Sequence, residues 1–275
     1  MARVVELSYY PVKGCAGVPA DDADVTVAGL AYDRSFMVVD DEGVFRSQRR
    51  DPRLALVRPG VGAGGERLLL RGPGLAPVDI AVDTTGARRG VILFGAPFTG
   101  IDQGDEAAGW LSEFLGAPCR LVRVPPEHHR VTDGRTPGTS GYADSCAVHV
   151  LSRASLALLN ARMAERGGAP LPMDRFRANI VVDGWDEPHT EDLIRRAAIG
   201  DVELAYAKLA GRCAVTTVDQ TTAGKAGPEP LRTLADYRRA AAGGVVFGAK
   251  FAVVRPGKLS VGDEVDVASW GASEL

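Results

Sequence analysis

The sequence predicts a β-rich α+β fold in two domains, residues 1–125 and 126–275, with helices at the periphery. Most apolar runs are short and separated by Gly and Pro, which is the pattern of strands joined by turns. Only a few segments carry apolar residues at helical spacing. A stretch rich in Arg, Thr, Gly and Pro begins at Pro125-Pro126 and runs to Gly141. This stretch marks the domain boundary.

The first domain is predicted to consist mainly of strands, with one helix at its end. Turn residues Asp40–Gly43 separate two of the strands and predict a hairpin. The apolar residues of Trp110–Leu115 recur at helical spacing, and Gly116 predicts the end of that helix. The predicted strands are Val4–Tyr9, Asp24–Leu30, Phe36–Val39, Val44–Ser47, Leu68–Leu70, Val78–Val82 and Val91–Phe94.

The second domain is predicted to mix strands with two helices. Ser152 is expected to cap a helix whose apolar face contains Leu159 and Met163 and which ends at Gly167-Gly168. A second helix is expected after Pro230. The predicted strands are Ala147–Leu151, Asn179–Val182, Val202–Tyr206, Phe251–Val254 and Leu259–Val267, the last as the closing strand of a small β-barrel.

Composition and charge exclude several classes of protein. The 275 residues are 45% hydrophobic and 24% charged, and 32 Lys plus Arg against 35 Asp plus Glu give a net charge of -3. This balance argues against nucleic acid or an anionic membrane as a partner. The charged N-terminus does not resemble a signal peptide, and no apolar run approaches the roughly 20 residues that span a bilayer. Four widely spaced cysteines suit a reducing compartment, so we expect a cytoplasmic protein.

Cys213 is the first candidate for chemistry. Taken alone, a cysteine before a β-prone stretch is typical of a small buried apolar residue. Here Arg212 precedes it, and polar residues such as Thr216 and Asp219 follow. A neighbouring cation and backbone donors favour the thiolate, which is the form that binds metal or attacks an electrophile.

A basic set of residues is the second candidate. Arg175 and Arg177 come just before a predicted strand, and at this spacing an extended chain would project them to the same side. Guanidinium groups bind phosphate through paired hydrogen bonds, although arginines at a strand start are commonly only solvated. Lys13, Arg34 and Arg49 fall near other strand ends. Together these cations would form one basic cleft for an anionic cofactor.

Taken in order along the chain, these segments resemble the MOSC family, named for the molybdenum cofactor sulfurase C-terminal domain. The resemblance is strongest to two-domain members of the amidoxime-reducing kind, and it covers nearly the whole chain. It implies an N-terminal β-barrel-like domain followed by a MOSC domain with a β-barrel core. The segments that carry it are Tyr10–Lys13, Asp33-Arg34, Arg49–Leu54, Tyr142–Ser145, Leu151–Leu156, Phe176–Ile180, Arg212–Asp219 and Glu229–Arg238.

The resemblance implies that Cys213 is the protein ligand to the metal of a molybdenum cofactor (molybdopterin), at the junction of the two domains. The side chains implied or expected to bind that cofactor are Lys13, Arg34, Arg49, Ser145, Arg177, Asn179, Arg212 and Thr216. Two positions depart from the family pattern. Gly14 and Cys146 stand where relatives often carry hydroxyl residues, which puts one hydroxyl contact in doubt and adds a second thiol near the site.

The activity implied by the resemblance is the two-electron reduction of N-hydroxylated compounds, such as amidoximes and hydroxylamines. Electrons would come from a separate ferredoxin- or cytochrome b5-like donor with its reductase, and no binding of pyridoxal phosphate, nucleic acid or membrane is expected. Two alternatives stay open at this point. One is a sulfur carrier that uses a persulfide on Cys213, and the other is a non-catalytic protein that only binds the cofactor.

Overall fold

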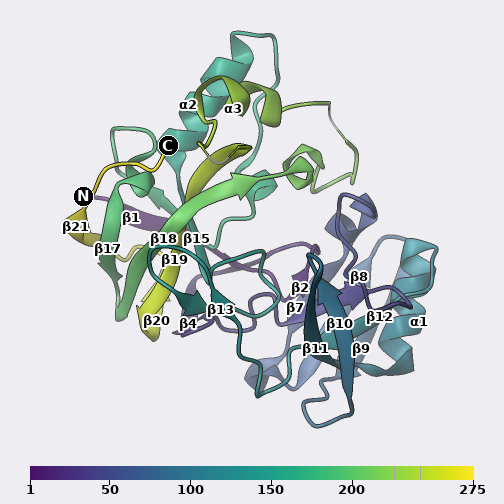
Figure 1. The fold of residues 1–275 in the computed structure, drawn as a ribbon. Coiled ribbons are helices and arrows are strands. Elements are labelled where there is room, and N and C mark those ends of the chain that lie inside the picture. The colour runs from purple at the N-terminus through teal and green to yellow at the C-terminus, as the bar shows by residue number, and fades with distance from the viewer. Residues whose placement is uncertain (226, 242) are drawn as a thin grey trace.

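A computed structural model describes residues 1–225, 227–241 and 243–275, and it divides the molecule into two lobes (Figure 1). The β-rich α+β fold predicted from the sequence is confirmed. One lobe is built around an eight-stranded sheet and the other around a five-stranded sheet. Within the described ranges, no helix is long and apolar enough to cross a membrane.

The eight-stranded sheet draws strands from both ends of the chain. In spatial order its strands are β21 (Val265–Trp270), β17 (Ile194–Ile199), β18 (Val202–Arg212), β19 (Val245–Arg255), β15 (Val148–Ser152), β16 (Ile180–Asp183), β1 (Arg3–Tyr9) and β3 (Val18–Ala20). Strands β15 and β16 are parallel, and the other neighbours are antiparallel. Because β1 pairs with β16, the beginning of the chain is part of a sheet otherwise formed mainly by its second half. The domain boundary at residues 125 and 126 stays a prediction.

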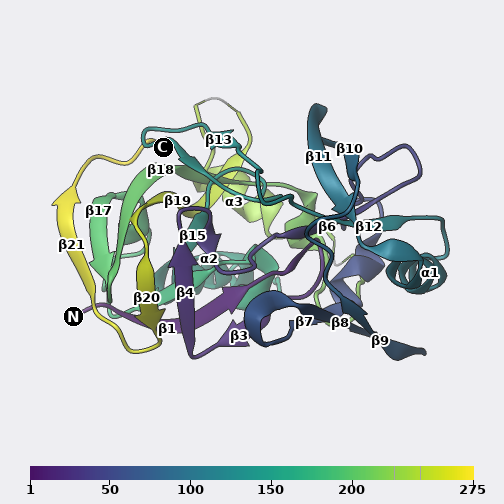
Figure 2. The same cartoon turned by 90° about the horizontal axis from the view of Figure 1, so that it is seen from below.

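The five-stranded sheet has the order β10 (Arg88–Leu93), β11 (Ala96–Asp102), β12 (Arg120–Arg123), β6 (Phe36–Val39) and β2 (Val12-Lys13). A three-stranded sheet of β7 (Arg58–Val61), β8 (Arg67–Gly72) and β9 (Leu75–Ala81) shares its core with helix α1 (Gly104–Leu115). Figure 2 shows these elements gathered in one lobe. Gly116 ends α1 with φ 70°, the left-handed conformation that glycine adopts readily.

The two faces of the eight-stranded sheet are covered differently. Helices α2 (Arg153–Ala164) and α3 (Leu231–Tyr237) pack on one face through residues such as Leu159 and Leu234, and Phe176 joins the same core. The opposite face packs against Val25, Leu30 and Leu259. Those three residues come from a small sheet of β20 (Gly257–Ser260), β4 (Asp22–Thr26) and β5 (Gly29-Leu30). A pair of short strands, β13 (Val131-Thr132) and β14 (Gly138-Thr139), lies against the eight-stranded sheet, where β14 contacts β19.

Local predictions such as a helix cap and a turn are confirmed, whereas two of the predicted strands are wrong because each is divided. Ser152 does cap α2, since its side chain accepts a hydrogen bond from the backbone of Ser155. The single strand expected at Leu259–Val267 is two strands, because β20 pairs with β4 whereas β21 pairs with β17. The strand expected at Asp24–Leu30 is likewise split, into β4 and β5. The hairpin expected after Phe36–Val39 does form its turn and its antiparallel pairing, since Phe45 pairs with Val39 and the backbone N–H of Arg46 donates to the carbonyl of Val38 at 2.8 Å, but its second arm is too short to count as a strand.

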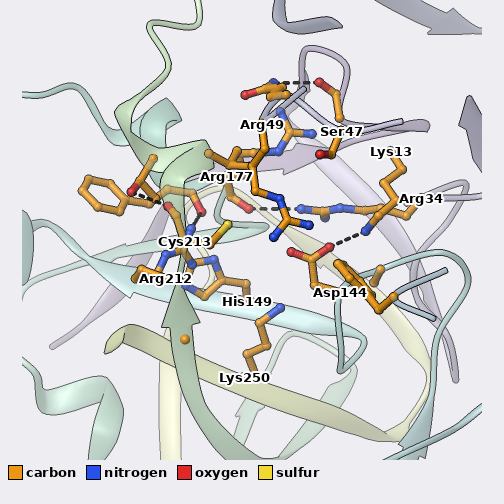
Figure 3. A pocket seen from close by; sticks show the side chains of 18 of the residues that line it. Lys13, Arg34, Ser47, Arg49, Asp144, His149, Arg177, Arg212, Cys213 and Lys250 are labelled. Atoms are coloured by element: carbon orange, nitrogen blue, oxygen red, sulfur yellow. Dashed lines mark hydrogen bonds and ion pairs between the residues drawn. The ribbon is translucent and has the colours of Figure 1, made fainter. Parts of the chain in front are cut away.

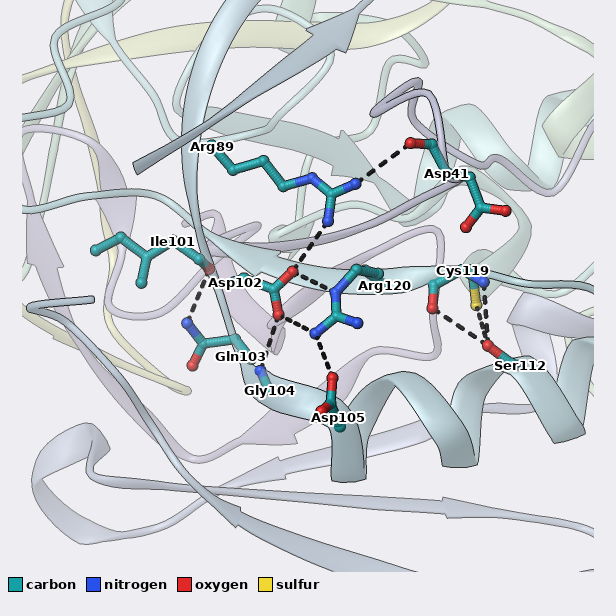
Figure 4. Close-up of polar contacts among 10 residues, drawn as sticks. All are labelled: Asp41, Arg89, Ile101, Asp102, Gln103, Gly104, Asp105, Ser112, Cys119 and Arg120. Carbon is teal, nitrogen blue, oxygen red and sulfur yellow. Dashed lines mark hydrogen bonds and ion pairs between the residues drawn. The ribbon is translucent and has the colours of Figure 1, made fainter. Parts of the chain in front are cut away.

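A charged network fixes the start of α1 to the five-stranded sheet (Figure 4). Asp102 ends β11 and accepts hydrogen bonds from the backbone of Gly104 at 2.9 Å, from Arg120 Nη2 at 2.7 Å and from Arg89 at 3.2 Å. Arg120 Nη2 also donates to Asp105, in the first turn of α1, at 2.9 Å. Burial alone would raise the pKa of Asp102, but the bonds from Arg120 and Gly104 outweigh it and hold the pKa low.

Replacing Asp102 by Ala should lower the free energy of unfolding by about 1–3 kcal/mol, because β10, β12 and the helix lose the acceptor that they share. Urea denaturation at pH 7 measures this loss. The matched control is Asp79→Ala, which removes an exposed pair with Arg67 and should cost about 0–0.5 kcal/mol. Equal losses in the two variants would contradict the role given to this network.

Candidate functional site

One cavity of about 480 Å³ lies between the lobes and takes side chains from both (Figure 3). Its walls combine basic, aromatic and thiol groups with glycine backbone. Eight of the nine predicted site residues line it, and Ser145 does not. The residues that line it include Lys13, Arg34, Phe45, Gln48, Arg49, Phe94, Asp144, Cys146, His149, Phe176, Arg177, Asn179, Arg212, Cys213, Thr216 and Lys250.

Cys213 reaches the cavity because the long strand β18 ends directly before it, at Arg212. Its side chain is exposed, and its sulfur points into the cavity (Figure 3), whereas the other three cysteines are buried. The backbone N–H and hydroxyl of Thr216 both donate to the carbonyl of Cys213, at 3.0 and 2.9 Å. Thr216 therefore holds the residue that carries the thiol. The interpretation of Cys213 as a buried apolar residue is wrong.

Two arginines from different lobes lie against one tyrosine ring. The guanidinium carbons of Arg34 and Arg177 lie 4.1 and 4.3 Å from the centroid of Tyr10. The Tyr10 hydroxyl donates to the carbonyl of Ala178 at 3.1 Å, and Arg34 Nη2 donates to the carbonyl of Arg177 at 3.2 Å. Cation–π contact and these hydrogen bonds hold two like charges close together at the cavity wall.

The turn before β16 separates the two arginines that were expected to point the same way. Met173–Phe176 forms a short 3-10 helix, and Arg177 follows it in the left-handed region with φ 54°. Arg177 lines the cavity, whereas Arg175 bonds Asp219 at 2.9 Å and is absent from the described lining. The expectation of an extended chain here is wrong, because the 3-10 turn rotates the side chains apart. Of Arg175 and Arg177, only Arg177 is therefore placed to bind a ligand in the cavity.

Arg212 shows that the cavity walls hold unused donor capacity. Its Nη2 donates to the carbonyl of Phe176 at 2.8 Å, but its buried Nε has no hydrogen-bond partner among the described residues. Burial lowers the pKa of Arg212, with Arg177 adding to that effect. A buried donor without an acceptor costs free energy that an anionic ligand would recover.

The remaining predicted residues differ in what they leave free for a ligand. Arg49 is exposed at the cavity edge. The Asn179 amide is already used, since it accepts from the backbone of His149 at 3.1 Å and donates to Ser8 and Asp33 at 3.1 Å each. Ser145 lies outside the cavity, between two residues that line it, and its role stays a prediction.

Three further residues that line the cavity, Asp144, His149 and Lys250, were not predicted from the sequence as site residues. Asp144 forms an ion pair with Lys13, and although burial alone would raise its pKa, Lys13 and Lys250 hold that pKa below its ordinary value. Burial lowers the pKa of Lys250 to about 8 and keeps the pKa of His149 well below its ordinary value. Asp144 stands in a motif segment, but His149 and Lys250 meet only through the register of β15 with β19.

The charge inventory favours an anionic ligand. Six cationic side chains line the cavity against the one carboxylate of Asp144, in the described part of a chain whose net charge is -3. Like charges packed in this way are unfavourable unless a counter-charge enters. No group of three or more His, Cys, Asp or Glu side chains in the described ranges could hold a metal ion.

The comparison with known families gives the class of protein. Residues 1–118 match the model of the MOSC N-terminal beta barrel domain, and residues 137–266 match that of the MOSC domain. The chain therefore belongs to the MOSC family, and the resemblance found from the sequence motifs is confirmed.

Within this family the chain is similar to the mitochondrial amidoxime-reducing component 1 of Homo sapiens, with 34% identity over 96% of this chain and 82% of that protein. It is equally similar to the mitochondrial amidoxime reducing component 2 of Rattus norvegicus, at 34% over 96% and 83% of the two chains. The molybdenum cofactor sulfurase of Danio rerio is 32% identical over 89% of this chain but only 31% of its own length.

The lowered pKa of Lys250 gives a stability prediction. A base whose pKa falls from 10.5 unfolded to about 8 folded destabilises the protein below pH 8, and this cost disappears as the pH rises to 10.5. Lys250→Met should therefore stabilise the ligand-free protein at pH 7 by about 1–3 kcal/mol, and the gain should shrink between pH 8 and 10. Urea denaturation across this pH range measures it.

The matched control is Lys258→Met, which removes an exposed lysine paired with Asp22 and should leave the profile unchanged. A gain from Lys250→Met that is the same at pH 7 and pH 10 would show that the charge of Lys250 is not responsible.

Proposed function

We propose that the protein is a molybdenum cofactor-dependent oxidoreductase that reduces N-hydroxylated compounds with electrons from a separate redox protein. The observation that carries the proposal is the exposed thiol of Cys213 in a cavity lined by six cations. The names of the amidoxime-reducing relatives support the substrate class, and the high coverage of those relatives supports the transfer of the activity.

The cavity residues fit such a cofactor. Cys213 would supply the thiolate ligand, because soft thiolates suit redox-active metals. Arg34, Arg177 and Arg212 would hold the phosphate and the pterin, and the free Nε of Arg212 would gain an acceptor. When bound, the cofactor supplies the two-electron redox chemistry.

The chain's own residues would position the substrate and manage protons. Reduction of an amidoxime to an amidine consumes two electrons and two protons and breaks the N–O bond, and the oxygen leaves as water. Lys250 Nζ, with a pKa of about 8, can carry a proton at neutral pH and release it to the cavity. His149 is buried with a lowered pKa, so it is neutral there and does not add to the positive charge.

A sulfur carrier is the alternative that the same thiol supports. An exposed Cys213 beside Arg212 could also bear a persulfide, and one relative is a molybdenum cofactor sulfurase. In that case no cofactor would stay bound, and the cations would steer an anionic acceptor to the thiol.

Metal and pterin analysis of the purified protein tests the proposal. We expect about one molybdenum and one pterin per chain, and Cys213→Ala should lose the metal and all reduction of benzamidoxime with an artificial electron donor, because the thiolate ligand is gone. The matched control is Cys119→Ala, which removes a buried thiol outside the described cavity lining and should keep both.

A protein without metal that carries cyanide-labile sulfur on Cys213 would replace the reductase with the sulfur carrier. A protein that holds molybdenum and pterin but reduces no N-hydroxylated compound would instead be a cofactor-binding or storage protein.

A further inference from the structure

An exposed aromatic side chain stands at the tip of a hairpin on the cavity wall. Phe94 and Gly95 connect β10 to β11, and Leu93 pairs with Ala96 across this two-residue turn. Phe94 is 48% exposed and lines the cavity that contains Cys213. β10 is the edge strand of its sheet, and its hairpin with β11 belongs to the N-terminal lobe (Figure 1).

The backbone at Phe94 is strained. Phe94 has φ 53° and Gly95 has φ 80°, so both turn residues are left-handed, as in a type I′ hairpin turn. Asn, Asp or Gly is favoured at the first of these positions, whereas a bulky aromatic residue is disfavoured there. Strain of this kind persists where the side chain has a use in the folded protein. Exposure adds to the cost, because the ring gains little from burial.

The rings of Phe94 and Phe45 lie at an angle to each other and together form an aromatic corner. The centroid of Phe45 lies 4.7 Å from that of Phe94, and the planes meet at 62°. The backbone N–H of Phe45 donates to the carbonyl of Ile92 at 3.0 Å, which ties Phe45 to the same hairpin. Lys13 Nζ lies 4.9 Å from the Phe94 centroid and 5.7 Å from that of Phe45. The two rings therefore form an open, angled apolar surface beside a cation.

This corner suits a flat ring better than a bulky aliphatic group. Aromatic rings attract one another in offset-stacked and edge-to-face arrangements at centroid distances of about 4.5–7 Å. A flat guest can stack on one ring of the corner and meet the other ring edge to face. The anionic part of a ligand would be drawn instead to Arg34, Arg177 and Arg212, which leaves the half-exposed Phe94 for an uncharged ring.

We propose that Phe94, supported by Phe45, selects substrates in which the N-hydroxylated group is attached to a flat aromatic ring. This inference rests on the proposed function, since it names the substrate class of the same cavity. Phe94 is a specificity-determining residue here, and the strained turn presents its ring to the incoming substrate.

The test uses the cofactor-loaded protein and two amidoximes of similar size. Benzamidoxime is flat, whereas cyclohexanecarboxamidoxime is apolar but puckered. Phe94→Ala should lower kcat/KM for benzamidoxime by about three- to tenfold and leave the value for the cyclohexyl compound within about twofold. Calorimetric Kd values for the two compounds should change in the same ratio. Ile92→Ala is the matched control, because Ile92 is exposed on the same hairpin but outside the described cavity lining.

A third variant tests the strain directly. Phe94→Asn places a favoured residue in the turn and should raise the melting temperature by about 2–4 °C while losing the preference for the flat ring. An unchanged or lower melting temperature would contradict the view that the turn is strained for the sake of the aromatic side chain.

The outcomes separate this inference from the proposed function. If the wild-type protein reduces neither amidoxime, the proposed function fails, and the calorimetric preference still decides the role of Phe94. If Phe94→Ala lowers kcat/KM and weakens binding equally for both compounds, or if neither compound binds, the two phenylalanine rings are not a substrate site. Loss of molybdenum and pterin from Phe94→Ala would also overturn the inference, because the ring would then serve the cofactor through Lys13.

Discussion

The buried carboxylate of Asp33 joins the parts of the chain from which the cavity is built. It accepts hydrogen bonds from the backbone of Tyr10 at 2.8 Å, from Arg34 Nη1 and from the amide of Asn179 at 3.1 Å. These partners lie directly after β1, in the turn before β6 and directly before β16. A buried charge must be paired and fully hydrogen-bonded, so the three segments have one favourable arrangement. That arrangement brings both Arg34 and Arg177 against the ring of Tyr10.

The rest of the site is a concentration of like charge held by rigid elements. β18 and β19 are each 11 residues long and pair along most of their length, so Cys213 and Lys250 are fixed by the same ladder. Burial lowers the pKa values of Lys13, Arg177, Arg212 and Lys250. The ligand-free protein thus carries an electrostatic cost that an anionic cofactor would remove. Binding energy from many cations is obtained at the expense of stability, as is common in functional sites.

The hairpin turn at Phe94 likewise combines a functional side chain with a backbone conformation that lowers stability. The turn would be more stable with Asn or Gly, yet it presents an aromatic ring to the cavity. Two features around this cavity therefore lower the stability of the ligand-free protein: the cluster of like charges and the strained backbone at Phe94. The cations and the ring line the same cavity.

By itself the sequence determined the fold class, most strands, the caps of α1 and α2, and the family, because periodicity, turn residues and motif order are local signals. It also named Cys213, Lys13, Arg34, Arg49 and Arg177 as one set, and the structure brings these together. Local signals failed where long-range pairing decides. The division of the last strand depends on partners in β4 and β17, and the turn at Arg177 depends on the 3-10 helix before it.

Only the tertiary structure decided which polar groups are free for a ligand. The side-chain amide of Asn179 is fully hydrogen-bonded to three other segments, and Arg175 is paired with Asp219. In contrast, Arg212 Nε has no hydrogen-bond partner among the described residues. Lys250 enters the site through strand register alone, and Phe94 enters through a hairpin from the other lobe. The physical reason is that availability is a property of a side chain's neighbours, and these neighbours are up to 171 residues away along the chain.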